Sequence, residues 1–468
     1  MRPVVLGLDV GTTSAKAAAF DASGARCAEA AVSYGLDEPE PGAAVQDPAL
    51  VVDAAVEALG RVASSTQPVA VACSTAMHGL VALDEADRPL TPLITWADTR
   101  AAAQAERLRA SHPQLHDRTG TPLHPMSPMV KLVWLRERHA ALHARARRWV
   151  GLKELVLHRL TGRWVVDWSV ASGTGLLDLA TLDWCDEALE LAGVRREQLA
   201  ELVAPTDVVG EGVVAGAGDG PLANLGVGAV RPGVAACSIG TSGALRLMVE
   251  RPVVDERRRL FCYALVSDRW AVGGAINNGG VVLRWARDAL APESSLEDVL
   301  ALASTAPAGC DGLVMAPYLL AERAPHWTAN ATGAYVGLRL HHGRAHLVRA
   351  ALEGVCQQLA LVLQSLVAAG QDVHEIRATG GFARSRFWRQ LLADVLGRPI
   401  GFPEQAEGTA FGAALLGLVA LGGLDTLDRA ADLVRIVEVV EPDLAAAARY
   451  RELLPAFERL AQAAILSG

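Results

Sequence analysis

Short apolar runs alternate along the chain with longer amphipathic stretches. The run 4–8 is too short for a helix and predicts a buried β-strand ending at Asp9. Residues 15–20 and 25–32 flank Ser23-Gly24, which favours a hairpin, although the many alanines weaken that prediction. A helical period over 49–63 leads to a second buried strand at 69–74. Strands that alternate with helices indicate an α/β architecture.

The remaining chain continues this alternation. We expect a strand at 80–83 and a short strand from Leu93 that leads into an alanine-rich helix. The loop 120–128 should be rigid, with Ser127 as the N-cap and Pro128 as the first residue of a helix. Residues 150–185 are interpreted as a peripheral insertion, with Lys153 on a helix. The region 410–466 is predicted to be one long helical region closing the fold, with 409–424 as a buried core helix rather than a membrane span.

Arg231-Pro232-Gly233 is the best candidate linker. It divides the chain into an N-terminal domain, 1–230, and a C-terminal domain, 234–468. A length of 468 residues allows two or three domains, each with a full core.

Composition narrows the class of protein. A hydrophobic fraction of 51% with 20% charged residues is typical of a soluble globular protein. The net charge of −9 without a basic stripe argues against a nucleic-acid partner. Seven scattered cysteines without a CxxC pair predict reduced thiols in a cytoplasmic protein, rather than disulfides or a zinc site. The apolar N-terminus is interrupted by Asp9 and lacks a cleavage signal, so we expect neither a signal peptide nor a membrane partner.

Two glycine–hydroxyl turns carry the first chemical signal. Asp9 and Gly11-Thr12-Thr13 follow the first predicted strand, and Gly240-Thr241-Ser242 follows a similar small-residue run in the second half. Backbone N–H groups at such a turn can bind phosphate, and Asp9 could hold a Mg²⁺ ion through water. The alternative is a tight turn in which Asp9 accepts turn N–H groups. Neither stretch is a P-loop, because no Gly-Lys-Ser/Thr follows.

A single carboxylate lies between the two turns. Asp219 occupies the glycine-rich stretch 215–220, just before the predicted linker. The glycines leave room for a substrate hydroxyl, whose proton the carboxylate could take during phosphoryl transfer. By itself the stretch also fits an aspartate in a surface turn, but its place between two phosphate turns favours the catalytic interpretation.

These features resemble a known family. The paired turns are similar to the phosphate loops of the superfamily of sugar kinases, actin and heat-shock chaperone ATPases. The stretch 126–135 resembles the first motif of the FGGY carbohydrate kinases and departs from the family pattern only at its tail, where Arg138 replaces a usual polar or acidic residue. The stretches 333–338 and 346–353 resemble the second motif. The resemblance spans residues 4 to about 421. It implies two actin-like (ribonuclease H-like) ATPase domains with an interdomain active-site cleft, and ATP and Mg²⁺ as cofactors.

Within the family the resemblance is closest to gluconate kinases, with xylulose kinases second. It is carried by 75–78, 94–98, 120–128, 153–154 and 277–280. The implied reaction is transfer of the γ-phosphoryl group of ATP to the terminal hydroxyl of gluconate, giving 6-phosphogluconate. The implied partners are ATP and a sugar acid, and a homodimer is left open. The non-enzyme alternative is an ATP-driven conformational protein. Asp219 argues against that alternative, because such a protein needs no proton acceptor for a polyol.

The resemblance also implies site residues. Asp9, Thr12 and Thr13 fall at the first phosphate and Mg²⁺ site, Gly240, Thr241 and Ser242 at the second phosphate turn, and Gly380 and Gly381 at the adenosine turn. Asp219 falls at the catalytic base, and Met77, His78, Trp96, Asp98 and Arg100 fall at the sugar.

A sugar acid also needs a cationic or hydrogen-bonding partner for its carboxylate, for which His78, His124, Arg100 and Lys153 are candidates. Alternatives stay open for several of these residues. Asp98 could be only an N-cap, Arg100 a solvated helix residue and His124 a structural histidine. Lys131 and Trp134 are interpreted as helix-face and core residues rather than ligands.

Overall fold

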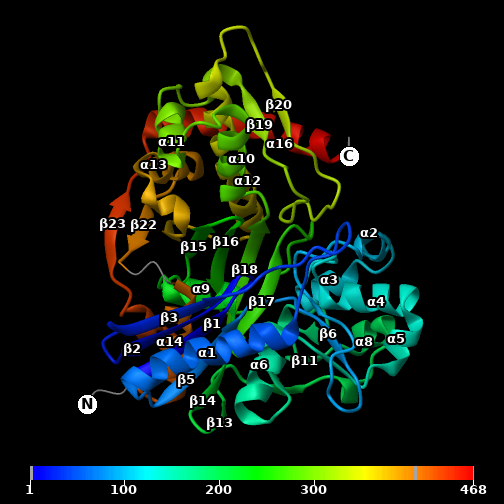
Figure 1. Ribbon diagram of the computed structural model, residues 1–468. Coiled ribbons are helices and arrows are strands. Elements are labelled where there is room, and N and C mark those ends of the chain that lie inside the picture. The colour runs from blue at the N-terminus through cyan, green and yellow to red at the C-terminus, as the bar shows by residue number, and fades with distance from the viewer. Residues whose placement is uncertain (1–3, 405–407, 467–468) are drawn as a thin grey trace.

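The computed structural model describes residues 4–404 and 408–466. Two β-sheets organise the chain, one in the lower part of Figure 1 and one in the upper part. The lower sheet has the order β13 (Val208–Gly210), β14 (Val213–Gly218), β5 (Ala70–Thr75), β1 (Val4–Val10), β2 (Ser14–Asp21), β3 (Arg26–Ser33). The upper sheet has the order β17 (Phe261–Val266), β18 (Arg269–Ile276), β16 (Gly243–Val249), β15 (Val234–Ile239), β21 (Glu375–Thr379), β22 (Ile400–Pro403), β23 (Ile436–Val440).

The two sheets repeat one topology. In the lower sheet β1 pairs antiparallel with β2 and parallel with β5, and in the upper sheet β15 pairs antiparallel with β16 and parallel with β21. Each glycine–hydroxyl turn therefore joins the first two strands of its own sheet. The predicted hairpin between β2 and β3 and the predicted α/β architecture are confirmed.

Helices cover the outer faces of both sheets. The lower sheet is covered by α1 (Pro48–Thr66) and α6 (Leu152–Thr161). On the upper sheet lie α12 (Arg344–Ala368) and α13 (Arg386–Leu396), and on these two helices pack α10 (Gly280–Leu290), α11 (Leu296–Ser304) and α16 (Leu444–Leu466). The helix α12 is long and apolar enough to cross a membrane by length and composition alone. Most of its apolar part is buried inside the protein, as expected for a core helix.

Two helices form a shared layer between the sheets. α9 (Asp219–Gly226) contacts strands of both sheets, and α14 (Gly408–Ala420) packs on α9 and on β1. One hydrophobic cluster runs through this layer and includes Val5 from β1, Leu222 from α9, Met248 from β16 and Leu415 from α14. The C-terminal half of the chain thus supplies a core helix to the lower sheet.

The lower part also carries a large helical extension, at the right in Figure 1. Its elements are α2 (Ala102–Ser111), α3 (Gln114–Thr119), α4 (Pro128–Arg138), α5 (Ala140–Arg145), α7 (Trp168–Ser172) and α8 (Asp186–Ala192), with the strand pairs β4 (Val45–Gln46) and β7 (Leu93–Ile94), β6 (Val81–Leu83) and β8 (Arg148–Val150), β9 (Val165–Asp167) and β12 (Glu201–Val203), and β10 (Leu177–Asp178) and β11 (Asp183–Trp184). Pro128 begins α4 as predicted. Ser127 is the residue before it but is no side-chain cap, because its hydroxyl donates to the carbonyl of Thr174.

The prediction of one helical region over 410–466 is wrong. Between α14 and α16 the chain forms α15 (Leu427–Ala431) and then β23, which joins the edge of the upper sheet beside β22. Ile436–Val440 is rich in β-branched residues and largely exposed, as an edge strand can be, but the run is short and lies between alanine-rich helices. A further strand pair, β19 (Val314–Ala316) and β20 (Ala334–Val336), lies at the top of the upper part.

Candidate active site

Two carboxylates meet at one edge of the lower sheet. β14, β5 and β1 are parallel neighbours, so their carboxyl ends lie together. Asp9 lies opposite Ser74 in β5 and Gly218 lies opposite Thr75, which brings Asp219 to the same edge. The Ser74 hydroxyl donates to Oδ1 of Asp9 at 3.0 Å. Asp9 and Asp219 therefore face the space between the two sheets.

Each glycine–hydroxyl turn is closed by a hydrogen bond from its glycine N–H to the carbonyl of a following serine. The N–H of Gly11 donates to the carbonyl of Ser14 at 3.0 Å, and the N–H of Gly240 donates to that of Ser242 at 2.8 Å. Thr13 and Thr241 are exposed at the two tips. Both turns are self-closed loops that present hydroxyl groups toward the cleft.

Three cavities line the cleft. The apolar cavity, about 660 Å³, lies between the second turn and the face formed by α10, α11 and α13, and its lining includes Thr241, Leu283, Leu300, Gly381 and Phe387. The polar cavity, about 690 Å³, has a lining that includes Asp9, Lys16, Asp219, Arg246, Gly380 and Arg384. The inner cavity, about 260 Å³, has a lining that includes Thr12, Met77, His78, Trp96, Asp219, Arg246, Tyr263, Arg323 and Trp327.

The cavities are connected through shared lining residues. Gly381 and Arg384 line both the apolar and the polar cavity, while Asp219, Ser238 and Arg246 line both the polar and the inner cavity. The apolar cavity suits a flat heterocycle, and the inner cavity suits a small polar molecule. A ligand with an apolar end and an anionic end could thus reach Asp219 from one side while a second, smaller ligand reached it from the other.

Asp219 begins α9, directly after β14. Its Oδ1 accepts the N–H of Gly220 at 2.8 Å. Burial raises the pKa of Asp219 above its ordinary value, and the nearby Arg246 guanidinium opposes that rise. A carboxylate in this environment is a better proton acceptor than an exposed aspartate.

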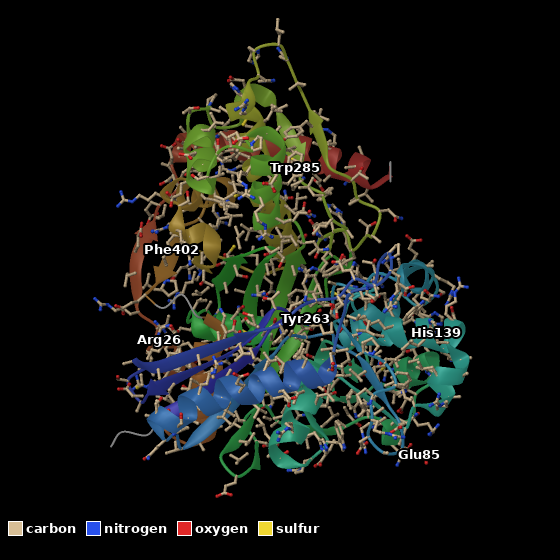
Figure 2. The ribbon with its side chains drawn as sticks, viewed as in Figure 1. Arg26, Glu85, His139, Tyr263, Trp285 and Phe402 are labelled. Carbon is tan, nitrogen blue, oxygen red and sulfur yellow. The ribbon has the colours of Figure 1, made fainter. Side chains whose placement is uncertain are left out.

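His78 is a neutral side chain in the wall of the inner cavity. Burial lowers its pKa to about 3, so the imidazole is uncharged at neutral pH. Nδ1 lies 2.7 Å from the carbonyl of Gly173, and because a carbonyl only accepts, Nδ1 carries the proton. Nε2 is therefore an acceptor, suited to a hydroxyl rather than to a carboxylate. The ring makes an edge contact with Tyr263, which Figure 2 shows in the middle of the molecule.

Trp96 links the first turn to the inner cavity. Its Nε1–H donates to Oγ1 of Thr12 at 2.9 Å. The guanidinium of Arg323 lies over the same ring, 4.8 Å from the centroid. Trp96 therefore contacts a residue of the first turn and a cation of the upper part at the same time.

Asp98 and Arg100 lie outside the three cavities. Asp98 is 1% exposed and accepts the N–H of Ala44 at 3.1 Å, while Arg100 pairs with Asp98 and Glu40. These bonds anchor the loop after Trp96. The two alternatives are wrong, since the N-cap of α2 is Ala101 rather than Asp98, and Arg100 is held in ion pairs rather than solvated.

His124 and Lys153, the other proposed carboxylate partners, do not line the inner cavity. His124 is buried behind Trp327, with its Nδ1 accepting the N–H of Met126 at 3.2 Å. Lys153 is fully buried, and its ammonium donates to the carbonyls of Cys73, Ala215 and Ala217 and lies 3.3 Å from Asp167. Its hydrogen-bonding capacity is taken up inside the protein.

Lys131 and Trp134 also lie outside the inner cavity. Lys131 is wholly buried and not on an exposed helix face, because its ammonium bonds the carbonyls of His78, Thr95 and Met126. Trp134 is a core residue as interpreted.

Sequence reasoning missed several residues of the inner cavity, among them Arg246, Tyr263, Arg323 and Trp327. Arg246 belongs to β16, where it is a single cation in an otherwise apolar strand. An isolated charge of this kind is a usable signal for a functional position. Arg323 and Trp327 lie in a loop without periodicity, and only folding brings them opposite Trp96.

The donor groups of the polar cavity fit one hard cation. Asp9 and Asp219 both line it. Within 4–404 and 408–466 there is no group of three or more His, Cys, Asp or Glu side chains that could hold a metal by itself. One or two carboxylates, with phosphate and water completing the shell, are the set that Mg²⁺ prefers.

Comparisons with known proteins agree with this geometry. Residues 4–225 match the N-terminal domain of the FGGY family of carbohydrate kinases, and 235–421 match its C-terminal domain. A gluconokinase of Bacillus licheniformis is 38% identical, with 99% of this chain and 96% of that protein covered. Among solved structures, gluconate kinase of Lactobacillus acidophilus superposes with a TM-score of 0.95 at 34% identity, covering 99% of this chain and 98% of the other. A ligand-bound xylulose kinase of the same species gives 0.95 and 34%, with 98% of each chain covered.

The fold and the cleft define a two-lobed actin-like phosphotransferase. The chain belongs to the FGGY family of carbohydrate kinases. Family membership implies ATP as the phosphoryl donor.

Proposed function

We propose that this kinase transfers the γ-phosphoryl group of ATP to the terminal hydroxyl of gluconate and gives 6-phosphogluconate. The observation that carries the proposal is the junction of the polar and inner cavities at Asp219 and Arg246. A hydroxyl in the inner cavity and a phosphoryl group in the polar cavity would meet there.

In the proposed reaction, Asp219 accepts the proton of the substrate hydroxyl. The hydroxyl oxygen bonds to the γ-phosphorus while the bond to the bridging oxygen breaks, and ADP leaves with the electron pair. Arg246, which lines both cavities, compensates negative charge on the phosphoryl group. The hydroxyl and backbone groups at Thr12, Thr13, Thr241 and Ser242 would bind the phosphates, and the apolar cavity beside Gly380 and Gly381 would bind adenosine.

A Mg²⁺ ion held by Asp9 and the phosphates would supply charge compensation during transfer. The chain's own contribution is the position of Asp9 at the end of β1, fixed by the bond from Ser74.

Gluconate is favoured over a neutral sugar by two observations. The relatives at 38% identity are named gluconokinases, whereas the xylulose kinases of Bacillus subtilis and Escherichia coli are 28% and 30% identical. The inner cavity is also lined by two arginines and one aspartate, a balance that suits an anionic acceptor. The alternative is a xylulose kinase, supported by the ligand-bound xylulose kinase with a TM-score of 0.95.

A substrate panel tests the proposal. We expect the highest kcat/KM for gluconate among gluconate, xylulose, ribulose and glycerol, measured by ADP formation at fixed ATP. A higher value for xylulose would overturn the assignment of the acceptor while leaving the carbohydrate kinase class intact.

We place the reaction in the cytoplasm. All seven cysteines are unpaired thiols, six of them buried, which fits a reducing compartment.

A further inference from the structure

Arg323 is a buried cation that makes no direct ion pair with the described residues. The residue is 9% exposed, and a guanidinium N–H donates to the carbonyl of Ile276 at 3.1 Å. Across 4–404 and 408–466 Arg323 takes part in no direct ion pair, and its Nε has no hydrogen-bond partner. The neighbouring Glu322 carboxylate attracts the guanidinium through space but is bonded elsewhere, because it accepts the N–H of Asn277 and the side chain of Asn278.

A charge held in this way costs free energy unless something pairs with it. Burial lowers the pKa of Arg323 to about 10, which still leaves it charged at neutral pH. Proteins retain such unpaired groups where a ligand supplies the missing partner.

Other unpartnered groups line the same cavity. Neither the hydroxyl of Tyr263 nor Nη1 of Arg246 has a hydrogen-bond partner in the described chain. Burial raises the pKa of Tyr263 far above neutrality, so its O–H remains a donor. The inner cavity thus offers three sets of donors, and a carboxylate, which only accepts, is their natural complement.

The two arginines differ in what else they contact. Arg246 lines the polar cavity as well and lies beside Asp219, where the phosphoryl group would arrive. Arg323 lines only the inner cavity. A substrate with its hydroxyl at Asp219 could therefore bring its carboxylate to Arg323 without entering the polar cavity.

We propose that Arg323, together with the Tyr263 hydroxyl, binds the carboxylate of the acceptor and makes the enzyme select a sugar acid over a neutral polyol. This inference rests on the proposed function and adds a residue that recognises the substrate class. The position of the Arg323 guanidinium over the Trp96 ring restricts its movement, and a guanidinium can give a carboxylate two parallel hydrogen bonds.

The test compares gluconate with glucitol, which has CH₂OH in place of the carboxylate. Arg323→Gln and Arg323→Lys are measured beside Arg344→Gln, which removes an exposed arginine at the start of α12. We expect Arg323→Gln to lower kcat/KM for gluconate by about tenfold to hundredfold, with little change for glucitol. Arg323→Lys should recover part of the loss, and Arg344→Gln should behave as the wild type.

Ligand-induced thermal shifts give a readout that does not need turnover. Gluconate without ATP should raise the melting temperature of the wild type and not that of Arg323→Gln. The melting temperature of each variant without ligand is measured as the control for a retained fold.

The outcomes separate the two proposals. Equal losses for gluconate and glucitol in Arg323→Gln, with gluconate still the best wild-type substrate, would overturn the role of Arg323 only. A gluconate-induced shift that persists in Arg323→Gln would do the same. A wild type that prefers xylulose and shows no shift with gluconate would overturn the proposed function itself.

Discussion

The ammonium of Lys153 donates a hydrogen bond to the carbonyl of Ala217 at 3.1 Å, two residues before Asp219. The same ammonium bonds the carbonyls of Cys73 in β5 and Ala215 in β14. The pairing of these strands is irregular between Val214 and Ala217, where Gly216 has a φ of +74° and a Cβ would overlap the Cys73 carbonyl. Lys153 thus stabilises the local distortion of β14 that leads to Asp219.

Lys153→Met should therefore act on turnover rather than on substrate selection. We expect kcat to fall by about tenfold or more, with the KM values for gluconate and for a neutral acceptor unchanged. The variant should also lose about 3–5 kcal/mol of stability, because Asp167 would keep a buried charge without its partner. Steady-state kinetics and a denaturant titration measure both effects.

Ser169→Ala tests the same segment with a smaller change. The Ser169 hydroxyl accepts the N–H of Gly218 at 3.1 Å and so holds the same segment from α7. We expect a smaller fall in kcat with the fold retained. If Lys153→Met instead raised KM for gluconate alone, Lys153 would be a substrate ligand after all.

Asp219→Asn should leave binding of ATP and acceptor nearly intact while lowering kcat by roughly 10²–10⁴, the range for loss of a general base. The amide keeps the shape and the bond from Gly220 but cannot take the proton. Calorimetric binding and single-turnover kinetics separate the two quantities. Near wild-type turnover would show that another group accepts the proton.

The pH dependence of kcat/KM should report Asp219. The base must be ionised, so activity is full above its pKa and is lost as the pH falls through it. Because burial raises that pKa, the acid limb should lie above the value of about 4 of an ordinary aspartate. His78, with a pKa of about 3, should add no limb at neutral pH.

Arg246→Gln should move this acid limb to higher pH. The Arg246 charge holds the pKa of Asp219 down, so its removal lets that pKa rise further. The variant will also turn over more slowly, and the position of the limb is therefore the relevant measurement. An unmoved limb would mean that another group controls it.

Asp9→Ala should weaken the binding of Mg²⁺ without unfolding the protein. We expect a higher Mg²⁺ concentration at half-maximal rate and weaker binding of Mn²⁺ in the presence of ADP, measured directly by titration. Ser74→Ala, which keeps the carboxylate and removes only its hydroxyl partner, is the matched control. Gross loss of structure in a circular-dichroism melt would instead favour a turn-stabilising role for Asp9.

Local patterns predicted the elements that carry the chemistry. The run ending at Asp9, the two glycine–hydroxyl turns and the glycine-rich stretch around Asp219 are set by neighbours in the sequence, and parallel pairing of β1, β5 and β14 brings them together. Met77 and His78 follow β5 and line the inner cavity for the same reason, whereas Trp96 reaches it from β7, outside that sheet.

The cationic residues were harder to predict, because sequence does not show where a charge is compensated. Arg100 and Lys153 looked available but find partners inside the protein, at Asp98 and at three backbone carbonyls. Arg246 and Arg323 come from the second half of the chain, and only the tertiary fold places them in the cavity. β23 was missed because its pairing with β22 is likewise a tertiary contact.

The contact between α9 and α14 determines how the cleft can change its width. Glycines lie where the two helices touch, because a Cβ at Gly226 would overlap the carbonyl of Gly408 and one at Gly412 would overlap the carbonyl of Leu222. Two backbones at this separation cannot approach further, so this contact opposes any closure of the lobes that would press the two helices together. A methyl group added at either glycine would act as a spacer that changes the angle between the lobes. Such a substitution, far from any substrate atom, would alter the alignment of the hydroxyl with the phosphoryl group.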